Sequence, residues 1–130
     1  MKKTVNYLFI LCVSLPIFSA AQSLSTTKLR CEYQENPIGI DIKVPRLSWQ
    51  LVAKNKNTIQ TGYHIKVAKK KEDVEQGINL VWDTKKITAN ESVHVAYQGE
   101  ALVARQRYYW QVKVWDNQGN ESDWSEPNLD

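Results

Sequence analysis

A run of alternating residues near the C-terminus constrains the fold of this chain more than any other feature. From residue 107 to 115, large apolar side chains occupy every second position. A period of two is typical of a β-strand with one buried face. A turn cluster at 116–120 and a short Ser/Trp segment at 122–125 follow, which predicts the closing hairpin of an antiparallel sandwich. The predicted buried face carries Tyr108, Trp110, Val112 and Val114, and the outward face carries Tyr109, Gln111 and Lys113.

Alternating segments recur along the rest of the chain. They predict about seven strands separated by turn residues. One helical turn is expected at 70–77, where Gly77 ends it. This spacing predicts an all-β fold, an antiparallel β-sandwich that forms one domain. The predicted strands are 28–33, 46–52, 58–69, 80–83, 92–97, 107–115 and 122–125.

The same alternation predicts which side chains enter the core. On the strand at 58–69, one face is apolar and the other carries Gly62, His64, Lys66 and Ala68, which we expect to point outward. The predicted inward residues of the first strands are Leu29, Cys31, Tyr33, Leu47, Trp49, Leu51, Thr61, Tyr63, Ile65, Val67, Val93, Val95 and Tyr97.

The first 21 residues are typical of an export signal. Lys2 and Lys3 precede a short apolar stretch at 7–18, and small residues at 19–21 suit signal peptidase. The apolar stretch is shorter than the about 20 residues of a membrane-spanning helix. We expect cleavage before Gln22, export from a bacterial cytoplasm and a mature domain at 22–130. The alternative is a buried N-terminal helix.

Removal of this segment leaves a nearly neutral domain. The 130-residue chain has a net charge of +3, and the segment contains two lysines and no acid, so the remainder carries +1. We therefore expect neither nucleic acid nor, after cleavage, a membrane as a partner. Cys31 is the one cysteine of the remainder, so the domain must be held together by its core.

The sequence offers no constellation for catalysis, a cofactor or a metal. Asp83 and Asp116 each follow a tryptophan, and we expect them to bind local backbone amides where strands end. His64 and His94 fall on outward positions of strands in opposite sheets, and neither has a second predicted metal ligand near it. Cys31 has no histidine at a motif spacing and is expected to pack as a small apolar residue.

Several positions resemble those of a fibronectin type III domain. Trp49 lies inward on the second strand, Tyr63 lies inward on the third, and Leu102 precedes Tyr108 by six residues. In that fold such a tyrosine closes a tyrosine corner, in which its hydroxyl bonds to main chain just upstream. We accordingly expect Trp49, Tyr63, Leu102, Tyr108 and Trp110 in the structural core.

Four longer motifs resemble the N-terminal module of bacterial α-L-rhamnosidases of glycoside hydrolase family 78. They are NPIGID (36–41), PRLSW (45–49), VWD (81–83) and YYWQVKVWD (108–116). The resemblance implies further β-sandwich domains and an (α/α)₆ barrel downstream, which in that family carry the acidic catalytic residues. No catalytic residue of the family maps onto this chain, which looks like a truncated product or an isolated module.

Four aromatic residues fall off the predicted inward register: Trp82, Tyr109, Trp115 and Trp124. They can pack against the next domain, stack on a sugar, or lie against the stems of neighbouring basic side chains. The segment 122–125 also resembles half of the WSxWS box of cytokine receptors, so Lys113 or Arg107 is expected to stack on Trp124.

The function expected from these features is a non-catalytic accessory module of an exported α-L-rhamnosidase. Its expected partners are the downstream domains of the same polypeptide and, through the off-register aromatics, a rhamnose-containing glycan. A free-standing carbohydrate-binding or protein-interaction sandwich is the alternative, and a free-standing enzyme is the weakest reading.

Overall fold

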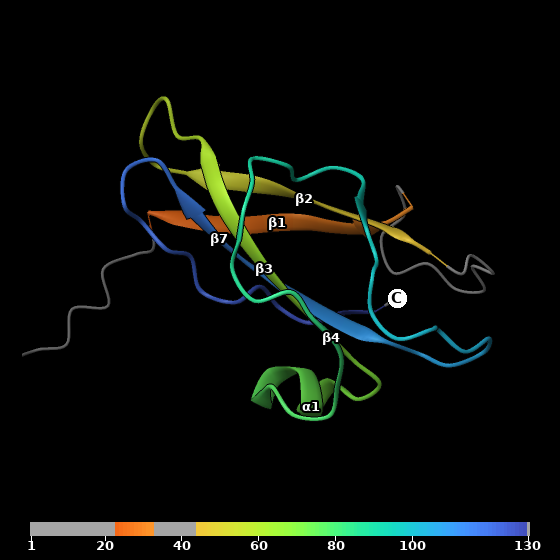
Figure 1. Cartoon of the computed structure of the whole chain (residues 1–130). Helices are drawn as coiled ribbons and strands as arrows, with labels where there is room; N and C mark the ends of the chain where they lie inside the picture. The colour runs from red at the N-terminus through yellow and green to blue at the C-terminus, as the bar shows by residue number, and fades with distance from the viewer. Residues whose placement is uncertain (1–22, 33–43, 130) are drawn as a thin grey trace, which may run out of the picture.

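Two antiparallel sheets form the architecture of the chain (Figure 1). The computed structural model describes residues 23–32 and 44–129. The first sheet has the order β1-β2-β6, and the second has the order β4-β3-β7-β8, with β5 also paired to β3. The strands are β1 (Leu24–Cys31), β2 (Arg46–Ala53), β3 (Gln60–Ala68), β4 (Leu80–Asp83), β5 (Ile87–Thr88), β6 (Val95–Ala96), β7 (Tyr109–Asp116) and β8 (Asn128–Leu129).

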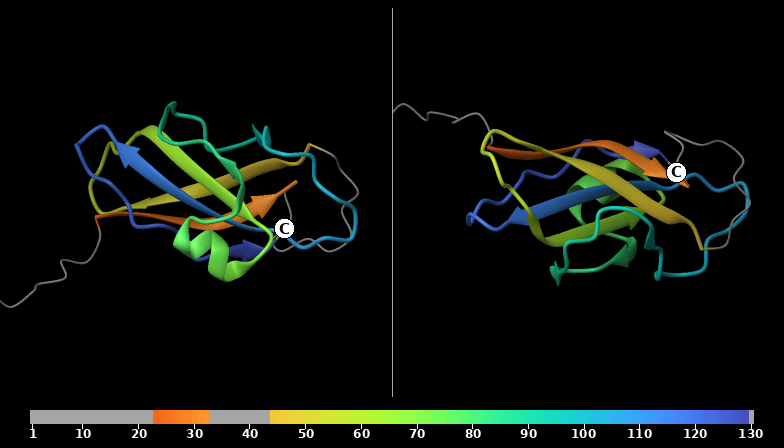
Figure 2. Two further views of the ribbon diagram at one scale, coloured as in Figure 1. Left: turned by 60° about the horizontal axis from the view of Figure 1, so that its bottom comes forward. Right: turned by 90° about the horizontal axis from the view of Figure 1, so that it is seen from above.

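The core lies between the two sheets, whose strands cross one another in the view from above (Figure 2). Alternation places the apolar face of every long strand there, because successive side chains of a strand point to opposite faces. The predicted all-β sandwich is therefore confirmed. The buried cluster comprises Leu24, Cys31, Leu47, Trp49, Tyr63, Ile65, Val67, Val81, Val95, Tyr97, Tyr108, Trp110, Val112 and Val114.

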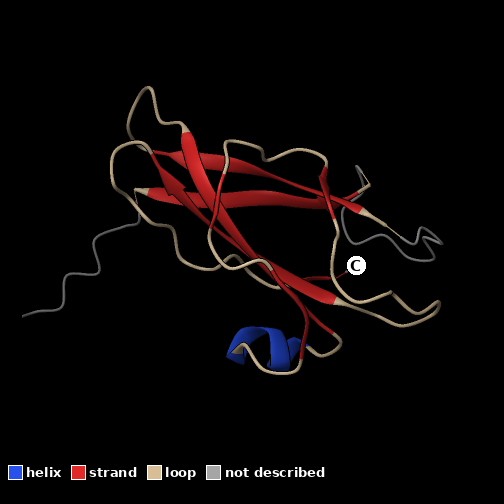
Figure 3. Cartoon of the chain, in the orientation of Figure 1, coloured by secondary structure: helices blue, strands red, loops and turns tan. Residues whose placement is uncertain are grey.

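One short helix, α1 (Lys71–Gln76), accompanies the strands at one end of the second sheet (Figure 3). It buries Val74 and contacts β3 and β7. Gly77 ends it in the left-handed conformation with a φ of 70°, as expected of a glycine C-cap. Within the described residues, no helix is long and apolar enough to cross a membrane.

Three predicted strands differ by more than two residues at one end from those of the structure. β1 begins at Leu24, before the predicted start, and Tyr33 lies outside the described residues. The strand predicted at 92–97 is reduced to β6, because Val93 is exposed and only two residues pair with β2. The segment 122–125 follows β7 through single main-chain bonds, and the regular closing strand is β8 instead.

Several residues of β3 and β7 differ in burial from the predicted faces. Thr61 is exposed, contrary to the alternation, whereas Tyr63, Ile65 and Val67 are buried as predicted. Lys66, Ala68 and Gln111, expected to point outward into solvent, are buried. The reason is that other parts of the chain cover the outer face of the second sheet: Trp124 lies over Lys66, and Gln111 is bound to Ser125.

Candidate functional site

The core aromatics tie the two sheets together and serve the fold. Trp49 of β2 and Tyr63 of β3 meet edge to face, with ring centroids 5.4 Å apart. The indole nitrogen of Trp49 donates a hydrogen bond of 2.9 Å to the side-chain oxygen of Gln60. These rings are buried and therefore not available to a ligand.

Tyr108 closes the tyrosine corner that the sequence predicted. Its hydroxyl oxygen accepts a 2.8 Å hydrogen bond from the main-chain N–H of Val103. Leu102, beside Val103, is half-buried and packs against the core, and Trp110 of β7 is fully buried. A buried phenol needs a polar partner, and the preceding loop supplies it.

On the outer face of the second sheet, Trp124 forms a platform with His64, Lys66 and Lys113. The ammonium groups of Lys66 and Lys113 lie 4.0 and 5.3 Å from the Trp124 ring, and the His64 ring meets its edge at 4.7 Å. Of the two predicted alternatives, Lys113 lies at the ring, and Lys66, which was not predicted to stack there, lies closer to it. This Trp124 platform is a set of cation–π contacts that fixes the segment after β7.

Two serines anchor the same segment to the main chain of β7. The Ser122 and Ser125 hydroxyl oxygens accept hydrogen bonds from Val114 N at 2.9 Å and Val112 N at 3.0 Å. Side-chain oxygens thereby replace carbonyl oxygens of a neighbouring strand. This explains why 122–125 runs along β7 without forming a regular strand.

An ion pair borders the Trp124 platform. His64 Nε2 and Asp83 Oδ1 lie 2.6 Å apart, and Lys85 Nζ lies 3.0 Å from Asp83 Oδ2. Partial burial raises the pKa of Asp83, but the hydrogen bonds from Lys85 and His64 outweigh it and lower the pKa to about 2. Burial under Trp124 lowers the pKa of Lys66.

The remaining off-register aromatics lie in separate places. Trp115 is half-buried, and the Lys86 ammonium lies 4.7 Å from its ring. Trp82 packs against the core and meets Tyr97 edge to face at 5.0 Å, so its predicted outward position is wrong. Tyr109 is half-buried opposite Ala68 and Leu129. Tyr109 and Trp115 share the face of β7 that carries Lys113, whereas Trp82 packs against the core. Among the described residues, no ring contact joins these three aromatics to Trp124.

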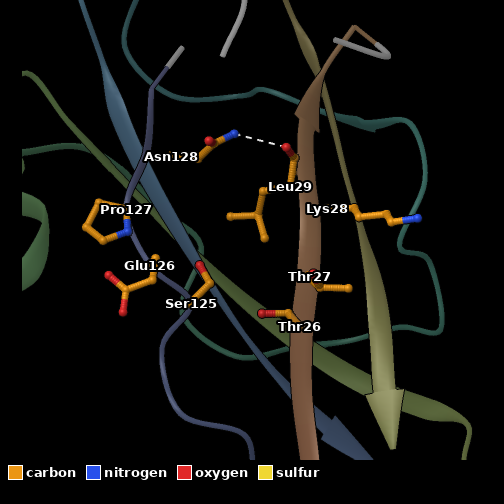
Figure 4. A pocket seen from close by; sticks show the side chains of 8 residues that line it. All are labelled: Thr26, Thr27, Lys28, Leu29, Ser125, Glu126, Pro127 and Asn128. Carbon is orange, nitrogen blue, oxygen red and sulfur yellow. Dashed lines mark hydrogen bonds between the residues drawn. The ribbon is translucent and has the colours of Figure 1, made fainter. Parts of the chain in front are cut away.

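A hollow of about 360 Å³ opens at an edge of the sandwich, between β1 of the first sheet and the segment before β8 of the second (Figure 4). Its walls are Thr26–Leu29 and Ser125–Asn128. Asn128 bridges them at one end, because its side-chain N–H donates a 3.0 Å hydrogen bond to the Leu29 carbonyl. Hydroxyl and amide groups face the hollow beside the apolar Leu29, whereas the Glu126 carboxylate points away from β1.

The structure also places the candidate metal ligands and strand-end acids. His94 is exposed, and the described residues contain no group of three or more His, Cys, Asp or Glu side chains that could hold a metal. Asp83 accepts from Lys85 N, and Asp116 accepts from Gln118 N and Asn120 N, as predicted for both. Cys31 is fully buried in the core, also as predicted.

Sequence reasoning missed both the His64–Asp83 pair and the hollow. Pairing of Lys66 with Asp83 across β3 and β4 brings His64 near Asp83, and that register has no local signal in the sequence. The hollow joins segments about a hundred positions apart, since Leu29 and Asn128 are separated by 99 residues. Only the fold brings its walls together.

The sheet order, the tyrosine corner and the Trp124 platform together define a domain of the immunoglobulin-like, fibronectin type III class. Residues 26–129 match the family model of the Rha78A-like, N-terminal immunoglobulin domain. The chain belongs to this family, which confirms the resemblance to the N-terminal module of α-L-rhamnosidases.

Similar proteins include α-L-rhamnosidases that are much longer than this chain. That of Formosa agariphila is 39% identical over 105 residues, which are 81% of this chain and 11% of the relative. The crystal structure of the Streptomyces avermitilis α-L-rhamnosidase complexed with L-rhamnose is similar with a TM-score of 0.77 and 37% identity over 82% of this chain and 10% of that one. The structure of the α-L-rhamnosidase from Dictyoglumus thermophilum is similar with a TM-score of 0.77 and 38% identity, over 81% of this chain and 12% of that one. The chain spans about a tenth of the length of these relatives.

Proposed function

We propose that this chain is the non-catalytic N-terminal domain of an exported α-L-rhamnosidase of glycoside hydrolase family 78, where it braces the domains that follow. One observation carries the proposal: the match covers four-fifths of this chain but only about a tenth of each relative. Most of each relative, with room for the hydrolytic machinery, therefore lies outside the matched region.

Four acids of the described residues have lowered pKa values, which supports a non-catalytic role for them. A general acid of a glycosidase needs a raised pKa, so that it is protonated at the working pH. Hydrogen bonds from Arg46 and Lys113 lower the pKa of Glu32 and Glu121. Burial raises the pKa of Asp83 and Asp116, but local hydrogen bonds outweigh it and lower both. These four carboxylates are thus held ionised.

Exposed apolar side chains support the bracing role. Exposed valines and isoleucines are normal singly, but each would gain stability if a following domain covered it. Six of them are about half exposed: Val44, Val52, Ile59, Ile78, Val93 and Val103.

The N-terminal segment supports export. It has the charged start, the short apolar stretch and the small residues of a cleaved signal. Mass spectrometry of the chain purified from the exported fraction should find Gln22 as the first residue. An intact Met1 in that fraction would contradict the signal.

The gene and its product test the accessory role together. Sequencing downstream of the codon for Asp130 should reveal a frame that continues for several hundred codons. The complete polypeptide should release nitrophenol from nitrophenyl α-L-rhamnopyranoside, and residues 22–130 alone should not. Release by residues 22–130 would overturn the non-catalytic assignment, and a stop codon after Asp130 would overturn the bracing role.

A further inference from the structure

The β1 wall of the hollow presents unused main-chain groups. In an antiparallel pair, every second residue bonds to its neighbour. At the two ends of β1, Ser23 O accepts a hydrogen bond from Lys54 N, and Glu32 N donates one to Arg46 O. The register between these ends therefore directs the main-chain N–H and C=O groups of Thr26 and Leu29 to the free edge of β1. The Asn128 side chain fills the position at Leu29. Thr26 keeps a main-chain donor and acceptor beside the hollow.

The opposite wall has further polar capacity. The Ser125 hydroxyl oxygen accepts from Val112 N, which leaves its proton to donate. The Glu126 side chain is exposed and forms no hydrogen bond or ion pair with the other described residues. Asn128 uses its N–H on Leu29, which leaves the amide oxygen as an acceptor. Figure 4 shows the Glu126 carboxylate directed away from β1, so the polar groups that face the hollow are those of Thr26, Ser125 and Asn128.

The shape of the β1 edge favours a compact ligand over an added strand. Lys28 has a φ of 50°, and the pairing register of β1 shifts between Thr27 and Arg30. Such a bulge bends the edge and interrupts the row of main-chain groups that an incoming strand needs. Asn128 blocks the same edge at Leu29. The volume of about 360 Å³ is near the lower end of the range for ligand pockets, which suits a molecule the size of one sugar ring.

We propose that this hollow binds a single sugar unit, with its hydroxyl groups on the Thr26 main chain, Ser125 and Asn128 and its apolar edge on Leu29. A 6-deoxy sugar suits both kinds of wall, because it carries several hydroxyls and a methyl group. The choice of L-rhamnose as the probe rests on the proposed function. The site itself rests on the geometry of the hollow.

The test is a titration of the ¹⁵N-labelled chain with L-rhamnose, followed by amide chemical shifts. Because the hollow is open and small, we expect a dissociation constant on the order of 1–10 mM. Titration to about 100 mM then saturates the site. Saturable shifts should be confined to residues 26–29 and 125–128. Asn128→Leu keeps the approximate size and removes the amide, and should weaken binding about fivefold.

A matched substitution controls for the loss of an asparagine amide. Asn90→Leu removes an exposed amide outside the lining of the hollow and should leave the affinity unchanged. Shifts that stay linear in sugar, that map to the Trp124 platform, or that weaken equally in both variants would overturn the proposal. A stop codon after Asp130 would remove the bracing role without affecting this result, so the two hypotheses fail separately.

Discussion

The Tyr108 hydroxyl holds the loop before β7 through one hydrogen bond to Val103 N. Tyr108→Phe removes the acceptor and leaves the Val103 N–H without this hydrogen bond, so we expect the free energy of unfolding to fall by about 1–3 kcal/mol. Urea denaturation measures the change. Tyr109→Phe is the matched control, since this half-buried neighbour should change stability by less than about 0.5 kcal/mol. Equal losses in both variants would show that the corner contributes nothing specific.

Gly99 stands where two aromatic rings leave no room for a side chain. A Cβ at this position would lie 2.5 Å from Trp82 Cβ and 2.5 Å from the Tyr97 hydroxyl oxygen. Tyr97 cannot retreat freely, because its hydroxyl donates a 2.6 Å hydrogen bond to Glu100 O. Gly99→Ala should therefore cost about 1–3 kcal/mol through overpacking. Thermal melting should show a clear decrease for Gly99→Ala and almost none for Gln98→Ala, at the exposed neighbouring position.

Asp83 gives the stability a dependence on pH. Its pKa is about 2 in the fold against an ordinary 3.8, so its ionised form is stabilised by about 2 kcal/mol above pH 4. That contribution is lost as the pH falls through the folded pKa. Asp83→Asn should lower the unfolding free energy by about this amount at pH 7, and the deficit should shrink between pH 4 and pH 2. Denaturation at several pH values measures it, and a deficit that is constant with pH would contradict the assignment.

At the scale of elements, Trp124 controls the outer face of β3 and β7. Trp124→Ala uncovers Lys66, and because burial is the main cause of its lowered pKa, that pKa should rise toward the ordinary value. The carbon shifts of Lys66 in a pH titration report this change. Trp115→Ala removes a ring that lies on Lys86 instead, so it should leave the Lys66 pKa unchanged. A Lys66 pKa that is insensitive to Trp124→Ala would mean that other groups bury this lysine.

Comparison of β3 and β7 with their predicted faces shows which burial can be predicted from the sequence. Alternation predicts the inner faces of β3 and β7, because burial there follows from the strand itself. It fails for Lys66 and Gln111, since their burial depends on a later segment that folds back over the sheet. The Trp124 stacking was predictable from the Ser/Trp motif. The hollow was not, because its two walls meet only through tertiary structure.

At the scale of the whole molecule, one core between two sheets must hold the fold. Trp49 is a large fully buried side chain of the first sheet, and it contacts Tyr63 of the second. Trp49→Ala opens a cavity and should cost about 3–5 kcal/mol. A domain of this size has about 5–15 kcal/mol of stability in total, so this variant should be partly or wholly unfolded.

Circular dichroism and fluorescence measured in the same urea series test this dependence. In the parent chain both signals should change at one urea concentration, because a single core implies one cooperative transition. In Trp49→Ala the shared transition should move to much lower urea. Trp115→Ala, which removes an equal ring from the outer face, should shift it far less. A small shift for Trp49→Ala, or two separate transitions, would mean that the sheets are stabilised independently of the core between them.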